Sequence, residues 1–132
     1  MKRRTFVLIF SLILVIAGIA VWNYVNKPAP KVEDASALAI TAEKLSDEYA
    51  KDETASNKKY LGQALEVSGM VVEITKNQDG KMVALLQADD PMSGVQCTFR
   101  KEVSIAAGEQ ITVKGFCTGY TLVVLLSDCI LL

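Results

Sequence analysis

The chain carries three cysteines and no histidine, which limits the chemistry that its side chains can perform. Cys97, Cys117 and Cys129 stand alone, with nineteen and eleven residues between them. Structural zinc sites draw four ligands from cysteine and histidine, often in closely spaced pairs, so we expect no metal site. A catalytic thiol needs exposure and a nearby cation or helix N-terminus. These cysteines alternate instead with apolar residues in predicted strands, and we interpret them as buried thiols or members of a disulfide.

Acidic side chains occur in adjacent pairs at Asp47-Glu48, Asp52-Glu53 and Asp89-Asp90. Paired carboxylates can act as general acid and base, and Asp89-Asp90 could contribute to a weak calcium site. Histidine is missing for a nucleophile–base pair, however, and no glycine-rich loop is present to hold a phosphate. We interpret the pairs as solvated helix and loop positions. The chain is therefore predicted to be a non-enzyme without a cofactor.

The N-terminal segment has the composition of a membrane span. Lys2, Arg3 and Arg4 precede an apolar run from Phe6 to Val25. Twenty residues at ~1.5 Å each would span ~30 Å, the thickness of a bilayer's hydrocarbon core. We predict a signal anchor over residues 1–25, with its basic end in the cytoplasm and the remainder extracytoplasmic. Cleavage after the small residues that end at Ala20 is the alternative, and it would release a secreted or periplasmic protein.

The remainder of the chain is mildly acidic. Residues 26–132 hold eleven Lys and Arg against fifteen Asp and Glu, a net charge of −4. Nucleic-acid binding depends largely on clustered cationic side chains, and no such cluster is visible. This charge balance makes a nucleic-acid partner unexpected.

A linker and one helix are predicted to follow the apolar segment. Residues 26–37 contain Pro28 and Pro30 among small and charged residues, which is typical of a tether. A helix is then expected to begin at the N-cap Thr41 and to end near residue 56 or 57. Its narrow apolar stripe comprises Leu38, Ala42, Leu45 and Tyr49.

From residue 60 onward the pattern predicts five strands, at 63–76, 82–88, 95–100, 110–117 and 121–132. Asp79-Gly80 is a strong hairpin signal between the first two. Five short strands leave two exposed edges in an open sheet, whereas a closed barrel removes them. Gly69 and Gly115, each in mid-strand, suit the sharp bends of a small barrel. The fold predicted for residues 38–132 is mainly β, a five-stranded barrel preceded by one short α-helix.

The order of several short motifs resembles the tRNA-anti-like family of bacterial OB-fold proteins. The motifs are Lys59-Tyr60-Leu61-Gly62 followed by VSGMVVEI, VQCTF, GEQITVKGFCTG and LVVLLSDCIL. The resemblance implies a Greek-key OB barrel, and such barrels often bind oligonucleotides or oligosaccharides on the face of their second and third strands. Here that face offers only Phe99, which its alternation points inward, so bases would find no stacking platform. In an OB barrel the third and fifth strands are neighbours, which makes a Cys97–Cys129 disulfide conceivable.

These observations predict a non-enzymatic, membrane-tethered OB-fold module that recognises an envelope protein or another envelope ligand. The alternative is a structural or assembly component that acts through homo-oligomerisation, because the second strand is apolar on both faces. Oligosaccharide or nucleic-acid binding is a minor alternative. The predicted location is the bacterial inner membrane, with a single span. The residues predicted to form a binding face are Gln87, Gln96, Thr98, Arg100 and Tyr120.

Overall fold

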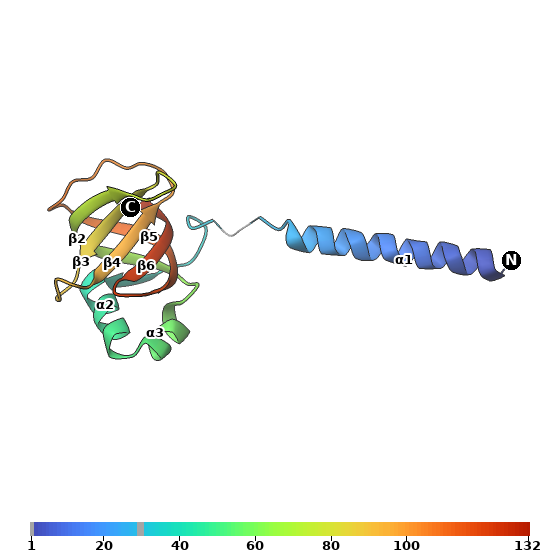
Figure 1. Ribbon diagram of the computed structural model, residues 1–132, viewed down its shortest axis with the longest axis horizontal. Helices are drawn as coiled ribbons and strands as arrows, with labels where there is room; N and C mark the ends of the chain where they lie inside the picture. The colour runs from blue at the N-terminus through green and yellow to red at the C-terminus, as the bar shows by residue number, and fades with distance from the viewer. Residues whose placement is uncertain (1, 29–30) are drawn as a thin grey trace. The chain divides into compact units, whose positions relative to one another are not determined.

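The computed structural model describes residues 2–28 and 31–132, and it divides into two compact units (Figure 1). The first unit holds the N-terminal helix and ends at residue 30, and the second comprises Lys31–Leu132. Of the predicted linker, Ala29 and Pro30 lie outside the described residues.

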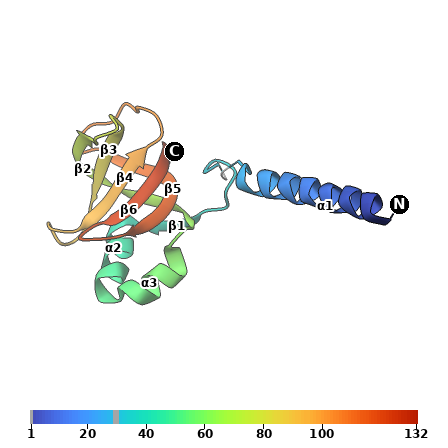
Figure 2. The ribbon, with the colours of Figure 1, turned by 45° about the vertical axis from the view of Figure 1, so that its right-hand side comes forward.

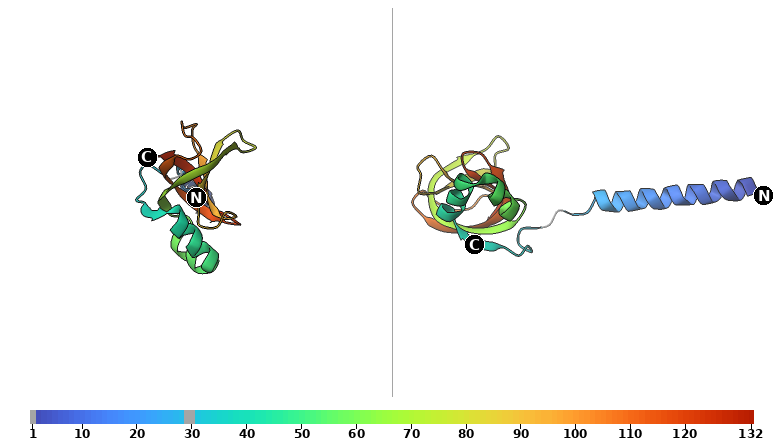
Figure 3. Two further views of the ribbon diagram at one scale, coloured as in Figure 1. Left: turned by 90° about the vertical axis from the view of Figure 1, so that its left-hand side faces the viewer. Right: turned by 90° about the horizontal axis from the view of Figure 1, so that it is seen from below.

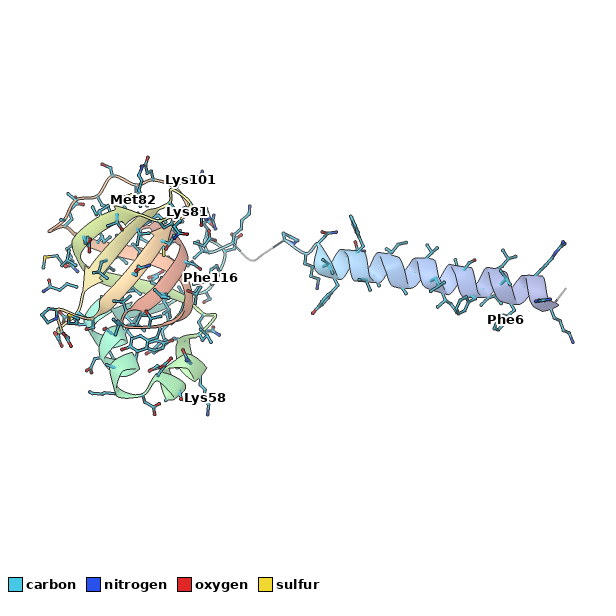
Figure 4. The ribbon with its side chains drawn as sticks, in the orientation of Figure 1. Phe6, Lys58, Lys81, Met82, Lys101 and Phe116 are labelled. Atoms are coloured by element: carbon cyan, nitrogen blue, oxygen red, sulfur yellow. The ribbon has the colours of Figure 1, made fainter. Side chains whose placement is uncertain are left out.

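Helix α1 (Lys2–Val25) is apolar around its whole circumference. It has a mean hydropathy of 2.7 over its most apolar window, and it is long and apolar enough to cross a membrane. No side chain of the helix is buried, and Figure 4 shows Phe6 projecting freely from it. Because apolar side chains on every face leave none suited to water, this helix needs an apolar surrounding. The predicted apolar span is confirmed, whereas its retention or cleavage stays a prediction.

The second unit is a closed barrel, as predicted (Figures 1 and 2). The strand order is β2-β3-β4-β6-β5, and β5 pairs with β2 to close it. Every neighbouring pair is antiparallel except β4 and β6, which run parallel. Five strands therefore share one interior, and each edge is paired. The strands span Ala64–Lys76 (β2), Met82–Gln87 (β3), Gly94–Phe99 (β4), Gln110–Tyr120 (β5) and Val124–Leu131 (β6).

Strand β2 is long because it pairs with two different strands of the barrel. Its first half pairs with β5 through residues 64–70, and its second half pairs with β3 after a register shift between Val71 and Glu73. A Cβ on Gly69 would lie 2.9 Å from the Cβ of Ala42, closer than carbon atoms approach. Glycine at this position therefore lets the helix that begins at Ala42 approach the strand, whereas the sharp bend expected at Gly69 stays a prediction.

An additional strand, β1 (Leu38–Thr41), pairs in parallel with residues 65–68 of β2. It occupies the edge of β2 that β3 leaves unpaired. The assignment of Leu38 to the apolar stripe of a helix was wrong. The parallel pairing joins residues 27 positions apart, and local periodicity cannot indicate such a contact.

Two short helices replace the single helix that was predicted. Helix α2 (Ala42–Lys51) begins at Thr41, whose hydroxyl accepts a hydrogen bond of 3.2 Å from the backbone N–H of Lys44. Helix α3 (Glu53–Tyr60) follows directly. Asp52 separates them in an extended conformation, and its carboxylate accepts from the N–H of Ala55 at 3.1 Å. Asp52 thus ends one helix and caps the next, because its side chain competes for backbone donors.

The two ends of the barrel are closed by different structures (Figure 3). Helix α2 covers the end at which β2 and β6 begin, which we call the helix-capped end; its residues Leu45 and Tyr49 enter the core. The loop 100–109 crosses the other end, the loop-covered end, and contributes the half-buried Val103 and Ile105. The largest buried side chains, each at most 2% exposed, are Tyr49, Tyr60, Phe99, Leu45, Leu65, Leu86, Leu126, Val32, Val67, Val71, Val95 and Val113.

A bulge in β6 decides which of its residues face the core. Val124, Leu126 and Cys129 are buried, and the register with β4 shifts between Cys97 and Phe99. Asp128 has a φ of 55° at this point, a left-handed conformation that aspartate tolerates better than most residues. Unbroken alternation back from Cys129 would place Val123 and Leu125 on the inward face, and the structure instead leaves both half-buried. Cys129 does point inward, but only because the bulge changes the alternation.

The segment 31–37, expected to be part of the tether, packs on the barrel. Val32 is fully buried, and Glu33 forms an ion pair of 2.5 Å with Arg100. Lys114 also donates to the backbone carbonyl of Glu33 at 3.3 Å. The compact unit therefore begins seven residues before the predicted boundary at residue 38.

Candidate functional site

The three cysteines lie in the barrel core as free thiols. The pKa of the Cys97 thiol is raised well above its usual range because it hydrogen-bonds to Cys129 and because it is buried. Cys97 and Cys129, for which the OB topology made a disulfide conceivable, are thus the two thiols that the fold brings together. Across β5 and β6, Cys117 faces Leu126, three residues before Cys129. A buried, protonated thiol is a poor nucleophile, which fits a packing role.

Cys129 also explains why β5 carries a glycine at its centre. A Cβ on Gly115 would lie 2.5 Å from the Sγ of Cys129 and 3.1 Å from the carbonyl oxygen of Ser127. Any side chain at this position would displace the sulfur or the β6 backbone. Gly115 and Cys129 therefore form a size-matched pair in the core.

The structure does not gather the five residues of the predicted binding face. Gln96 and Thr98 are half-buried and point outward from β4, and Gln87 is exposed at the end of β3. Arg100 is engaged with Asp128, to which its Nε and Nη2 donate at 2.7 and 2.5 Å. Tyr120 lies at the helix-capped end, stacked on Tyr49 with ring centroids 5.1 Å apart. Their function as one binding face stays a prediction.

Aromatic side chains are scarce on the outside of the barrel. Phe99 is 1% exposed and points inward, as predicted. Phe116, labelled in Figure 4, is half-buried on the outward side of β5, and Tyr120 is half-buried beside helix α2. These are the aromatic residues in the described strands. Successive bases would need several exposed rings on one face, and these strands do not provide them.

A polar and aromatic junction joins the two helices to the barrel. The hydroxyl of Tyr49 lies 3.3 Å from the Sγ of Cys117, and both groups are buried. The hydroxyl of Tyr60 donates a short hydrogen bond to Glu48, which also pairs with Lys59 at 3.2 Å. The hydrogen bond from Tyr60, followed by the one from Lys59, holds the pKa of Glu48 below its usual value. These contacts fix α2 against α3 and the barrel end.

A cavity of about 310 Å³ lies at this junction, between α2, the β3–β4 loop and the turn before β6. Among the described residues, four carboxylate side chains line it and no lysine or arginine does. Its apolar wall includes Met92 and Leu122, which are 74% and 70% exposed. The lining residues are Glu43, Ser46, Asp47, Ala50, Ala88, Asp89, Asp90, Met92, Ser93, Tyr120 and Leu122.

Ser46 distinguishes this cavity from an ordinary surface hollow. The residue is 2% exposed, and its Oγ has no hydrogen-bond partner within the described part of the chain. A serine within a helix commonly bonds to the carbonyl four residues earlier, but this hydroxyl does not. A buried hydroxyl without a partner costs free energy, so a group that binds beside it would gain from the contact.

A second, larger hollow of about 630 Å³ lies at the loop-covered end. Lys76 and Glu102 are among its lining residues, and they neutralise one another at 2.9 Å. The ion pair satisfies both charged groups, so the larger hollow lacks the unpartnered polar group of the first. We therefore take the cavity beside Ser46 as the candidate site.

Sequence reasoning identified only part of this site. It noted Asp47, Asp89, Asp90 and Tyr120, and it interpreted the acidic residues as solvated positions on separate elements. It missed Ser46, Met92 and Leu122, because a serine in a helix and exposed apolar loop residues carry no motif. Residues from three elements meet here only after the barrel has closed. Among the described residues, no three Asp, Glu or Cys side chains converge as a metal site would require.

Comparisons with known proteins agree with this architecture. The sequence profile of the tRNA_anti-like family matches residues 1–130. One similar crystal structure is that of a protein from Klebsiella pneumoniae described as a candidate nucleic acid-binding lipoprotein, with a TM-score of 0.58 and 14% sequence identity. The similarity covers 71% of this chain and 92% of that chain, and at this identity it establishes the fold alone. No curated protein matches the chain.

The family match extends over both units, from the apolar helix to the last strand. It agrees with the closed five-stranded barrel and with the motifs on which the resemblance rested. The protein therefore belongs to the tRNA_anti-like family of OB-fold proteins.

Proposed function

We propose that the protein is a non-enzymatic binding module, held on the extracytoplasmic side of a bacterial inner membrane by α1, that recognises an envelope protein. The observation that carries the proposal is the composition of the cavity at the helix-capped end. Exposed Met92 and Leu122 stand beside four carboxylates there. Surfaces that combine apolar anchors with a charged rim are typical of protein-recognition sites.

Charge and shape favour a protein over a nucleic acid. The barrel unit Lys31–Leu132 contains ten Lys and Arg and fifteen Asp and Glu, a net charge of −5. A phosphate backbone would be repelled, and the strands offer no series of exposed rings for bases. The activity suggested for the Klebsiella protein is therefore the lesser candidate for this chain. Homo-oligomerisation through β3 also has less support than expected, since its outward apolar residues Val83 and Leu85 are 8% exposed and half-buried, respectively.

Photo-crosslinking in cells tests recognition at this site. A photoreactive amino acid at Met92 or at Leu122 should yield discrete adducts with another envelope protein. The same amino acid at Lys101, which lies at the opposite end of the barrel (Figure 4), should yield none and serves as the matched control. Adducts of twice the chain's mass would favour the homo-oligomer, and equal patterns at all three positions would overturn the proposal.

Two further measurements test the location and the nucleic-acid alternative. Alkaline phosphatase fused after Leu132 should be active, and the mature protein should keep the residues of α1. A mature N-terminus after Ala20 would remove the anchor.

Full-length protein in lipid nanodiscs should not bind single-stranded RNA or DNA oligonucleotides at low salt. Binding that weakens steeply with salt would instead indicate a nucleic-acid module.

A further inference from the structure

The carboxylates and the buried hydroxyl of the candidate cavity together define the chemistry of its occupant. Within the described residues, Glu43 and Asp89 have no ion-pair partner, and the carboxylate of Asp90 accepts only from the backbone N–H of Met92, at 2.9 Å. Asp47 pairs with Lys51 at 2.9 Å, but both side chains are largely exposed, so the pair is weak. The cavity therefore carries a negative potential that favours a cation.

The unpartnered Oγ of Ser46 is an independent sign of a ligand. Ser46 lines the same cavity, is 2% exposed and leaves its hydroxyl unsatisfied in the described part of the chain. A hydroxyl oxygen accepts a hydrogen bond from a cationic donor, and such charge-assisted bonds are stronger than neutral ones. One acceptor among separated carboxylates suits a compact ammonium group better than a planar guanidinium, which prefers a bidentate partner.

The apolar wall of the cavity and its volume further limit the kind of cation that can bind there. A metal ion needs oxygen ligands that converge on one point, and no group of three such side chains does so among the described residues. A lysine side chain combines an ammonium group with an apolar stem of four methylenes. That stem fits beside Met92 and Leu122, which are exposed here. At about 310 Å³ the cavity has the volume of a small ligand pocket, and one side chain fits it better than a chain of sugars.

We propose that this cavity binds the side chain of a lysine on the partner protein, with its ammonium group between the Ser46 hydroxyl and the surrounding carboxylates. The lysine stem packs against Met92, Leu122 and the ring of Tyr120. The inference rests on the proposed function, because it names the residue of the partner that the helix-capped end recognises.

Methyl NMR on the full-length protein in phosphatidylcholine nanodiscs tests the proposal. The chain has four methionines, so ¹³C-methyl labelling gives a simple spectrum in which Met92 reports on the cavity. Met82, which is 8% exposed near the loop-covered end, is the internal reference. The probes are three peptides of seven residues that differ only at the centre: lysine, acetyl-lysine and norleucine.

The lysine peptide should shift the Met92 methyl signal to saturation and leave Met82 unchanged. The acetyl-lysine and norleucine peptides should bind at least tenfold more weakly, because each lacks the positive charge. Asp89→Asn should weaken binding of the lysine peptide several-fold. Asp79→Asn, which removes the same charge from the turn between β2 and β3 at the other end, should not. Equal binding of the lysine and norleucine peptides would overturn the proposal.

Ser46→Ala is the most informative variant, because it should weaken binding without destabilising the fold. Removal of an unsatisfied hydroxyl should leave the barrel as stable as before or more stable. Affinity for the lysine peptide should nevertheless fall about tenfold, the usual effect of losing a hydrogen bond to a charged group. Unchanged affinity in both Ser46→Ala and Asp89→Asn would refute the lysine site. If crosslinks from Met92 persist in that case, the protein-binding function stands and only the lysine assignment fails.

Discussion

The core of the barrel is covered by helix α2 at the helix-capped end and by the loop 100–109 at the loop-covered end. At the helix-capped end, α2 places Leu45 and Tyr49 into the core, and both are at most 1% exposed. At the loop-covered end, the loop 100–109 contributes only half-buried Val103 and Ile105. A helix presents several side chains on one face, whereas a loop of similar length presents few. The helix-capped end should therefore be the more stable of the two.

The two ends also differ in the polar groups that they offer to a binding partner. The helix-capped end is tightly packed beneath its surface, yet it carries the unpartnered Ser46 hydroxyl and the acidic cavity. The loop-covered end has a larger hollow, in which Lys76 and Glu102 neutralise each other. A binding site is best formed where rigid elements hold unsatisfied groups in place. This comparison is the reason why we propose the helix-capped end as the binding end.

The largest expected effect comes from Leu45→Ala. Deletion of this fully buried side chain should cost about 2–5 kcal/mol, since the cavity left behind cannot collapse fully. Pulsed alkylation of the full-length protein in nanodiscs, read for each cysteine by mass spectrometry, measures the loss. Cys117 should react faster than Cys129, because it lies nearer the helix-capped end. Val103→Ala is the matched change at the other end and should cost about 1 kcal/mol or less; an equal cost would contradict the comparison.

A smaller loss is expected from Tyr49→Phe, which keeps the ring and deletes the hydroxyl beside Cys117. Burial and the hydrogen bond to Cys117 raise the pKa of Tyr49, so the hydroxyl is protonated throughout the neutral range. The loss of one buried hydrogen bond should cost about 1 kcal/mol. The midpoint of urea-dependent alkylation at Cys117 measures it. Tyr120→Phe, which retains the stacked ring, is the control and should behave as the unaltered protein.

Acid should loosen the helix-capped end through Glu48. The hydrogen bond from Tyr60 is the main reason why the pKa of Glu48 lies below its usual value in the folded chain. The contribution of the Glu48 carboxylate to stability is therefore complete above its pKa in the unfolded chain, near 4.5. This contribution disappears as the pH falls through the lower pKa of the folded chain. Glu48→Gln should flatten this part of the stability–pH curve by at most about 1 kcal/mol. A curve of unchanged slope would show that the α2–α3 contact does not depend on this carboxylate.

The smallest effect is expected at the loop-covered end from Lys76→Met. Lys76 and Glu102 are 64% and 69% exposed, and water screens their attraction. Alkylation of Cys129 should proceed at an unchanged rate in the variant. A marked acceleration would mean that the ion pair holds the loop in place, and the contrast between the two ends would then be smaller than we infer.

Much of this fold was predictable from local patterns. Apolar composition and length indicated α1, and alternation indicated the strands, the closed barrel and the inward positions of Cys97 and Cys117. The N-cap at Thr41 was also recognised correctly. Such features depend on residues that lie close together in the sequence, where helix and strand periods are directly visible.

Other features depended on contacts between distant segments. Strand β1 formed by parallel pairing with β2, and the bulge at Asp128 placed Cys129 on the same inward face as Val124 and Leu126. Val32 became core although its segment reads as a tether. None of these leaves a periodic signal in the sequence, because each arises from pairing or burial against a remote partner.

The candidate site belongs almost entirely to this second group. The amino-acid order determines that the chain has an apolar helix, a mildly acidic body and a small barrel with thiols inside. Only closure of that barrel brings α2, the β3–β4 loop and the turn before β6 around one cavity. The chemistry of a recognition site depends on which side chains share a few ångströms of space. Long-range packing decides that proximity, and neighbouring residues in the sequence do not encode it.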